Sequence, residues 1–363
     1  MSPVQLECGD GSPLRLAKAA KHDSINAILS PMFVAHISLF LRQTIEGEMS
    51  TAFQNPPAPA HTITPSPPTS NTPSSLLTGA EVRKASRNGS HTSSTSGLAK
   101  TYIQANLIIL PSRYAADFRL LCARNPVPCP LIAESATVGK YDAVKSWLTG
   151  LEGPDLLSAH DIRRDVPKYM VYRDSKLVKS HCADIVDEWT EDHVAFLIGC
   201  SYSFESALSD AGLPPRHTTA DTIVPIYRTN IPLCPAGVFT GATYITSMRP
   251  YKRSEIEKVR DITRAFSVTH GEPIAWGWDA VERLGIKDID TPDWGNPPVS
   301  TDGSRFGAFY GDEENVPVFW GCGVTPQEAV MKAGLEGTVM GHAPGHMLIL
   351  DCRDWDIVLK AGS

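Results

Sequence analysis

Short runs of apolar residues, separated by turn-forming residues, predict buried β-strands from residue 104 onward. Residues 104–111 form an apolar run that ends at a proline, and residues 194–200 and 316–322 are continuous apolar runs that each end in Gly-Cys. Continuous runs are typical of strands that are covered on both faces. Residues 168–179 predict a hairpin that turns at Asp174 and Ser175, and residues 347–351 predict a last strand.

Residues that favour helix N-caps precede several segments with helical periodicity. Ser112, Ser203 and Ser254 each stand where a helix is expected to begin, with the third helix predicted over residues 255–266. Residues 325–328 match a capping box with proline at the first helical position. A further short helix is predicted over residues 184–189.

The stretch from 224 to 250 breaks both periodicities. Its prolines, at positions 225, 232, 235 and 250, are expected to prevent a regular central strand. Its glycines, at 237 and 241, allow turns. Arg228, Thr229, Asn230 and Arg249 lie between them and are suited to holding carboxylates. Two interpretations stay open here, a binding site and an ordinary surface loop.

The N-terminal part has a different composition. Residues 49–78 are rich in Pro, Ser and Thr, which predicts disorder. Residues 1–77 are therefore interpreted as an extension and linker, and residues 78–363 as the globular region. Met49 begins the Pro-rich tract, so one interpretation of residues 1–48 is an upstream extension. Residues 49–90 faintly resemble a transit peptide, although an ordinary linker is the preferred interpretation.

Composition narrows the function. The net charge of −7 argues against a nucleic-acid partner, and the apolar residues 25–41 are too few and too interrupted to span a membrane. The 8 cysteines include no Cys-x-x-Cys pair and no zinc spacing, so we expect reduced thiols inside a cell and no metal site. The motifs of P-loop ATPases, dinucleotide-binding folds, α/β-hydrolases and zincins are absent, and no cofactor is expected.

Two segments of the chain resemble each other. Residues 196–208 and 318–330 both run from an apolar strand through Gly-Cys and a small residue into a predicted helix. Each would bring a cysteine and a group of backbone N–H donors to a helix N-terminus. The alternative is that the likeness is generic and the cysteines only fill space.

The candidate residues follow from these features. A helix N-terminus lowers a thiol pKa, so Cys200 or Cys322 is a candidate nucleophile. Glu205 and His342 are candidate acids or bases. Candidate substrate-binding groups are Ser201, Ser203, Arg228, Thr229, Asn230, Arg249 and Thr325. The structural alternatives are buried cysteines, surface ion pairs and helix caps.

Many ordered motifs resemble the D-glutamate cyclase-like family, whose bacterial members are usually labelled hydro-lyases. The resemblance covers about residues 78–355. Its motifs are Gln104-Ala-Asn-Leu, Arg124-Asn-Pro-Val-Pro-Cys-Pro130, Asp161-Ile-Arg163, Phe196-Leu-Ile-Gly-Cys-Ser-Tyr-Ser-Phe-Glu205, Tyr227-Arg-Thr-Asn-Ile231, Pro235-Ala-Gly, Ser247-Met-Arg-Pro250, Phe319-Trp-Gly-Cys-Gly-Val-Thr-Pro-Gln327 and His342-Ala-Pro-Gly-His-Met347.

The resemblance implies an α/β fold, with a mixed sheet core flanked by helices and an associated smaller α+β subdomain. It implies cyclisation of D-glutamate to 5-oxo-D-proline with loss of water, and a cytoplasmic or mitochondrial location. An arginine would hold one carboxylate of this amino acid while the N–H groups of the two Gly-Cys turns hold the other. Another carbon–oxygen lyase and a non-catalytic carboxylate-binding protein stay open as alternatives, and a homo-oligomer is possible.

Overall fold

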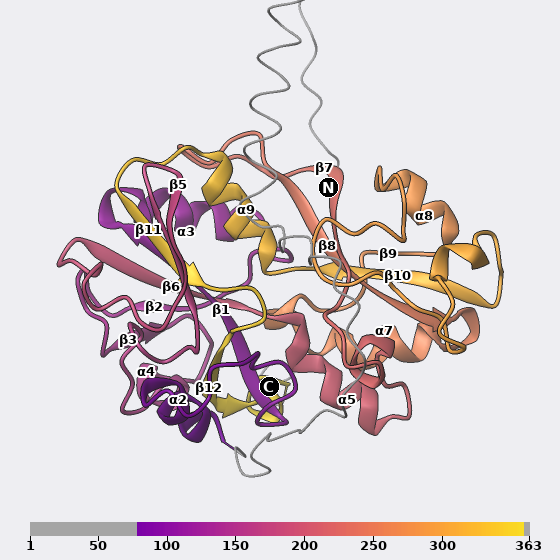
Figure 1. Ribbon diagram of the computed structural model, residues 1–363, viewed down its shortest axis with the longest axis horizontal. Coiled ribbons are helices and arrows are strands. Elements are labelled where there is room, and N and C mark those ends of the chain that lie inside the picture. The colour runs from indigo at the N-terminus through magenta and orange to yellow at the C-terminus, as the bar shows by residue number, and fades with distance from the viewer. Residues whose placement is uncertain (1–77, 359–363) are drawn as a thin grey trace, which may run out of the picture. The chain divides into compact units, whose positions relative to one another are not determined.

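The computed structural model describes residues 78–358, which form two β-sheets with helices around them (Figure 1). The extension and linker predicted over residues 1–77 lie outside the described residues, and that division of the chain stays a prediction. In chain order the elements are α2 Gly79–Arg87, β1 Tyr102–Pro111, η1 Ser112–Tyr114, α3 Ala115–Arg124, β2 Leu131–Ser135, β3 Val144–Ser146, α4 Gly153–Leu156, β4 Tyr169–Arg173, β5 Lys176–Cys182, β6 His193–Gly199, η2 Ser201–Phe204, α5 Glu205–Asp210, α6 Arg216–Thr219, β7 Ile226–Pro232, β8 Thr243–Lys252, η3 Arg253–Glu255, α7 Ile256–Arg264, η4 Ser267–Thr269, β9 Ala275–Trp276, α8 Trp278–Arg283, η5 Phe306–Phe309, β10 Asn315–Gly321, α9 Val324–Lys332, β11 Thr338–His342, β12 Leu348–Arg353 and α10 Asp354–Val358.

The larger sheet contains eight strands in the order β3-β2-β6-β1-β11-β4-β5, with β12 also paired to β1. Strand β1 is central and pairs with β6 along its length, from Ala105 opposite Gly199 to Pro111 opposite His193. Its other edge pairs first with β12 and then with β11. The turn between β11 and β12 therefore lies beside the middle of β1. The predicted apolar runs and the hairpin at Asp174 and Ser175 are confirmed.

The smaller sheet has the order β7-β8-β10-β9 and corrects the expectation for residues 224–250. This stretch holds two strands, and β8 lies centrally between β7 and β10. Pro250 has no N–H to donate, but β8 tolerates it for two reasons. The pairing of β8 with β7 ends before Pro250, at Ser247. On the other side, its partner in β10 is Pro317, which also lacks an N–H. Gly237 and Gly241 have φ of 52° and 70° and shape the turn between the strands.

The predicted α/β class is confirmed, with helices flanking a larger and a smaller sheet. All paired strands among residues 78–358 are antiparallel. The two sheets therefore have no carboxyl edge of parallel strands, which is where α/β proteins with parallel sheets bind their ligands. No helix within residues 78–358 is long and apolar enough to cross a membrane.

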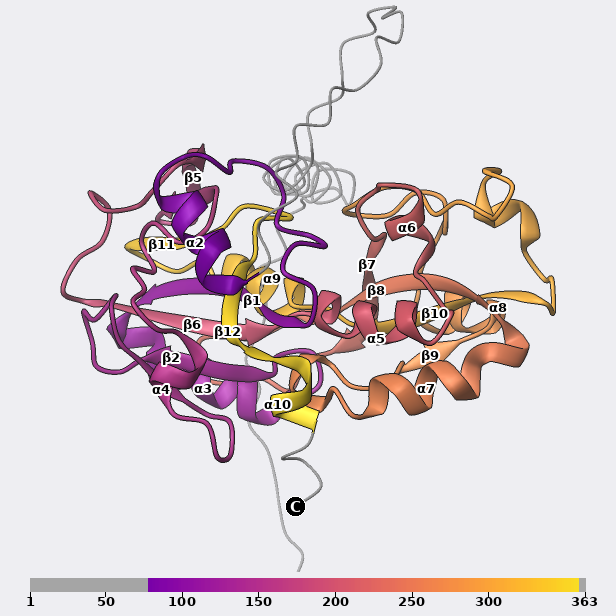
Figure 2. The same cartoon turned by 90° about the horizontal axis from the view of Figure 1, so that it is seen from below.

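The two sheets exchange helices at their junction. Segments η2 and α5 follow β6 of the larger sheet, yet the Phe204 ring lies 5.6 Å from Trp320 of β10. Helix α9 follows β10 of the smaller sheet, yet Ala329 and Val330 share a core cluster with Phe196 of the larger sheet. Figure 2 shows α5 and α7 close to the smaller sheet. This exchange brings the ends of β6 and β10 into one region.

Several predicted caps are wrong because tertiary contacts use the same hydroxyls. Ser203 accepts a hydrogen bond from the Gln104 backbone N–H, and Thr325 bonds to the Ile245 backbone. Ser112 bonds to Asp192 instead of capping α3. Residues 184–189 form turns and no helix. Helix α7 agrees with its predicted position to within a few residues.

Candidate active site

The two Gly-Cys turns have the same local geometry. Both Cys200 and Cys322 are buried, and each sulfur is approached by the backbone N–H two residues later, that of Tyr202 or Val324. The side chain of Tyr202 packs in one apolar cluster with Cys322 and Val324, so the turns lie close together. The sequence resemblance between the two segments therefore reflects a shared structure.

The predicted lowering of the thiol pKa is wrong. Burial raises the pKa of Cys200 to about 12 and that of Cys322 to about 11, although the nearby N–H groups act in the opposite direction. Removal of the thiols from water disfavours the thiolate more than the helix ends favour it. Both thiols are thus protonated near neutral pH, which argues for a structural role.

A buried ionic network lies beside these turns. Arg249 of β8 has 0% exposure and donates through Nε (2.9 Å) and Nη2 to Oε1 of Glu205, the first residue of α5. Its Nη1 donates to Ser247 Oγ at 3.0 Å, and its Nη2 also to Ser201 Oγ at 3.1 Å. Every guanidinium nitrogen of Arg249 is therefore engaged by the protein itself.

The Glu205 carboxylate has partners on both oxygens. His217 Nε2 lies 3.2 Å from Oε2, and the Thr218 hydroxyl lies 3.4 Å from the same oxygen. Burial raises the pKa of this carboxyl, but Arg249 and His217 lower it by more, and the net pKa is below its ordinary value. Glu205 is therefore ionised at neutral pH, as a proton acceptor has to be.

Glu205 forms part of the wall of a pocket of about 140 Å³. The pocket lies between residues 97–104, residues 202–210 and Thr218. Gln104 also lines it, and its side-chain oxygen is buried with no hydrogen-bond partner among the described residues. A buried amide without a partner costs free energy unless a ligand or water satisfies it, so its place in this wall indicates a binding site.

Two other cavities are less suited to polar chemistry. A groove of about 630 Å³ lies beside α3, but Arg119, its one charged lining residue, is already paired with Glu134 at 2.6 Å. A cavity of about 30 Å³ beside His342 is otherwise lined mainly by apolar side chains. The pocket at Glu205 is the one of the three that combines a buried carboxylate with an unpartnered amide.

His342 lies at the end of β11 and does not line this pocket. Its Nδ1 is 2.8 Å from the Ala343 carbonyl oxygen, which can only accept, and its Nε2 is 2.8 Å from Gln327 Nε2 and 3.1 Å from Asn106 Oδ1. Burial lowers the pKa of His342 to about 4. The ring is neutral at pH 7, and it orients side chains of β1 and α9.

The pH dependence of stability should report this buried histidine. Since the pKa of His342 is about 4 in the folded protein and 6.5 ordinarily, its stabilising contribution is complete above pH 6.5 and is lost as the pH falls toward 4. The loss amounts to about 3 kcal/mol. The unfolding free energy, measured with urea between pH 7 and 4, should therefore fall less steeply with decreasing pH in His342→Gln than in wild type. An equally steep fall in both proteins would contradict the prediction.

Sequence reasoning missed His270, which lies near the end of β10. It has a left-handed φ of 89° and its Nε2 is buried without a partner among residues 78–358. Its Nδ1 donates to the Val127 carbonyl at 2.8 Å, and burial lowers the pKa of the ring to about 4. No sequence motif marked this residue, because its position depends on the packing of residues 267–271 against Gly199 and Gly321.

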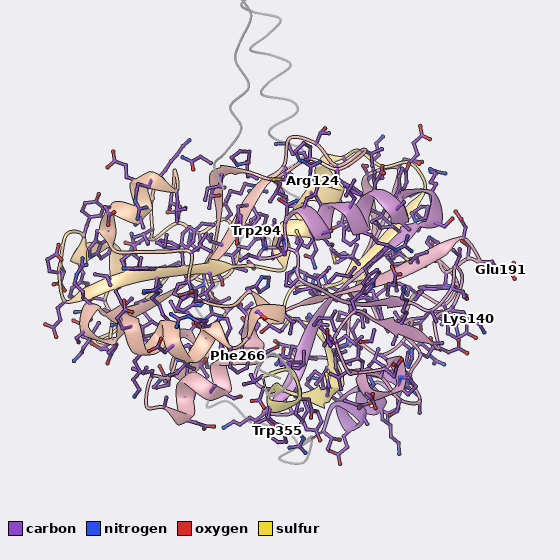
Figure 3. All side chains as sticks on the ribbon, turned by 180° about the vertical axis from the view of Figure 1, so that it is seen from behind. Arg124, Lys140, Glu191, Phe266, Trp294 and Trp355 are labelled. Atoms are coloured by element: carbon purple, nitrogen blue, oxygen red, sulfur yellow. The ribbon has the colours of Figure 1, made fainter. Side chains whose placement is uncertain are left out.

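Three predicted carboxylate-binding residues lie elsewhere, on β7. Arg228 binds Asp293 at 2.7 Å and Glu328 at 3.0 Å, and it stacks 4.2 Å from the ring of Trp294, which is labelled in Figure 3. Thr229 donates to the Tyr244 carbonyl, and Asn230 is exposed. The structure thus joins Arg249 and Ser201 to Glu205 by hydrogen bonds. Of the predicted site residues, Ser203 and Glu205 line the pocket. Those outside its lining include Arg228, Thr229, Asn230 and Thr325.

Replacement of Arg228 should have little effect. Its side chain is 39% exposed, and exposed ion pairs contribute about 1 kcal/mol or less. We expect Arg228→Ala to lower the unfolding free energy by about that amount and to leave turnover unchanged, as measured by urea unfolding and initial rates. A large loss of turnover in a folded Arg228→Ala variant would instead indicate that Arg228 belongs to the active site.

Comparison with known proteins adds an independent line of evidence. Residues 194–351 match the family model described as D-glutamate cyclase. A protein of Schizosaccharomyces pombe named "Putative hydro-lyase" is 44% identical over 272 residues, covering 75% of this chain and 83% of that protein. A protein of Natranaerobius thermophilus with the same name is 43% identical over 277 residues, covering 76% and 95%. Among solved structures, a nitrogen repressor-like protein of Methanococcus jannaschii matches at a TM-score of 0.31 with 9% identity, over 76% of this chain and 95% of that chain.

Proposed function

Because this chain belongs to the D-glutamate cyclase family, we propose that it is a hydro-lyase that converts D-glutamate to 5-oxo-D-proline with loss of water in the pocket at Glu205. The observation that carries the proposal is the ionised carboxylate of Glu205 in the pocket wall, held by Arg249 and His217. A substrate that must lose protons from an ammonium group requires such an acceptor.

A single carboxylate can transfer all the protons that the reaction moves from the nitrogen to the departing oxygen. The substrate nitrogen forms a bond to the γ-carbonyl carbon, and one γ-oxygen departs as water. The nitrogen loses two of its three protons, and the departing oxygen gains two. Glu205 accepts one proton from the nitrogen and passes it to the departing γ-oxygen. It then transfers the second proton in the same way, so the carboxylate is ionised again at the end of the reaction. His217, at 3.2 Å from Glu205, orients this carboxylate.

The remaining groups of the pocket position the substrate. The buried Gln104 side-chain oxygen can accept a hydrogen bond from the substrate ammonium, and the Ser206 hydroxyl can donate to a carboxyl group. The attack is intramolecular, so holding the amine near the carbonyl carbon supplies a large part of the rate enhancement. Arg249 acts through Glu205, because its donors are already used within the protein.

A product assay tests the proposal. The purified full chain is incubated with D-glutamate and, separately, with L-glutamate, and 5-oxoproline is separated by chiral chromatography. We expect 5-oxo-D-proline from D-glutamate. Absence of product from both enantiomers at high enzyme concentration would contradict the proposal. Dehydration of a different hydroxy or amino acid in the same assay would instead indicate another carbon–oxygen lyase.

A further inference from the structure

Lys100 is the only positively charged residue among those that line the pocket at Glu205. It is exposed, so it lies at the mouth, whereas Glu205 is 8% exposed and forms the inner wall. No ion pair of Lys100 with another residue occurs within residues 78–358. Asp210, the other acid of the lining, is exposed like Lys100. Lys100 therefore carries the positive charge of the lining, and Glu205 carries its buried negative charge.

The backbone around Lys100 is held in an unusual conformation. Ala99 and Thr101, its two neighbours, have φ of 45° and 71°, in the left-handed region that non-glycine residues rarely occupy, β-branched threonine least of all. Ala99 is buried against Val82 and Ile349, and the Thr101 carbonyl accepts a hydrogen bond from the Asp354 backbone N–H. These contacts hold the backbone on both sides of Lys100 and so fix the direction in which its side chain starts, although the side chain itself is exposed to solvent.

The buried Glu205 and the exposed Lys100 match the two charged groups of an α-amino acid in one orientation. An ammonium group is attracted to the ionised Glu205 in the inner wall, and a carboxylate is attracted to Lys100 at the mouth. Arg249 cannot serve that carboxylate, since Glu205, Ser201 and Ser247 occupy its donors. Lys100 is therefore the lining residue whose charge can bind this carboxylate.

We propose that Lys100 determines substrate specificity by binding the α-carboxylate of the amino acid, the carboxylate that stays intact in the cyclised product. This inference rests on the proposed function, since it assigns a second contact to the same substrate. It predicts a requirement for a free α-carboxylate in addition to the reacting γ-carboxylate.

The test compares two substrates in Lys100→Met. D-glutamate and its α-amide, D-isoglutamine, both contain the amine and the γ-carboxylate needed for ring closure, but only D-glutamate has the α-carboxylate. We expect wild-type protein to prefer D-glutamate, and Lys100→Met to lower kcat/KM for D-glutamate by roughly 10- to 100-fold, as expected for a charge-assisted hydrogen bond, without changing that for D-isoglutamine. Lys140→Met is the matched control, because Lys140 is a surface lysine 3.8 Å from Asp142.

A binding measurement separates this inference from the proposed function. Glutarate has both carboxylates and no amine, so it cannot cyclise, and its affinity is measured by calorimetry in wild type and in both variants. Weaker glutarate binding by Lys100→Met alone supports the lysine's role even if D-glutamate gives no product, which would contradict only the proposed function. Equal glutarate affinity in all three proteins, or an unchanged preference for D-glutamate over D-isoglutamine, would overturn the assignment of Lys100.

Discussion

Glu205→Gln is expected to lower kcat for D-glutamate by about 10²- to 10⁴-fold, the usual contribution of a general acid–base group. The glutamine keeps the size of the side chain and one oxygen for Arg249, but it cannot accept the substrate proton. The measurement is steady-state formation of 5-oxo-D-proline by wild type and variant at the same pH. KM should change much less than kcat, because Lys100 and Gln104 still hold the substrate.

Glu134→Gln provides the matched control. Glu134 is also a buried glutamate paired with an arginine, since Arg119 Nε lies 2.6 Å from its carboxylate, but it lies on β2 and does not line the pocket. Both substitutions therefore remove a buried charge next to an arginine. We expect only Glu205→Gln to lose turnover. An unchanged kcat in folded Glu205→Gln, or an equal loss in both variants, would contradict the assigned role.

The same carboxylate should influence acid stability. The folded-state pKa of Glu205 is lowered, so its contribution to stability is present above the ordinary pKa of 4.5 and is lost as the pH falls below that value. His342 loses its contribution at higher pH, as the pH falls from 6.5 toward 4. The two residues can therefore be distinguished by the pH range in which each substitution changes the unfolding curve.

Arg249→Met is expected to lower the unfolding free energy by roughly 3–5 kcal/mol, the usual cost of leaving a buried charge without its partner. Arg249 has 0% exposure, and its loss leaves the Glu205 carboxylate with only His217 and Thr218 as polar partners. The methionine retains apolar contact with Phe204 and Trp320, whose rings lie 5.0 and 5.3 Å from the guanidinium carbon. Urea unfolding of the full chain at pH 7 measures the effect.

A double variant separates lost charge pairing from lost packing. If the unpaired carboxylate causes the cost, then Arg249→Met combined with Glu205→Leu should be more stable than the sum of the two single effects predicts. Additive effects would show that the two side chains do not stabilise each other. A cost below about 1 kcal/mol for Arg249→Met would likewise contradict the importance of the buried pair.

The local pattern of apolar residues was enough to locate several of the long strands in the sequence. Apolar runs that end in proline or Gly-Cys mark β1, β6 and β10, because a strand buried on both faces requires a continuous run of apolar side chains. The resemblance between the segments around Cys200 and Cys322 was also visible, because both turns use the same backbone geometry. Glu205 and Arg249 could be named as candidates from residue type and context alone.

Only the tertiary structure decided which of these candidates meet. Arg228 and Arg249 looked equivalent in the sequence, but β8 carries Arg249 inward to Glu205, whereas Arg228 pairs with Asp293 and Glu328 at the surface. Burial, which no local pattern measures, reversed the expected pKa shift of both cysteines. Lys100 and Gln104 became parts of a pocket because η2, which leads into α5, packs beside the start of β1, a contact between segments about a hundred residues apart. The chain thus specified its strands through local side-chain pattern, and its site through long-range packing.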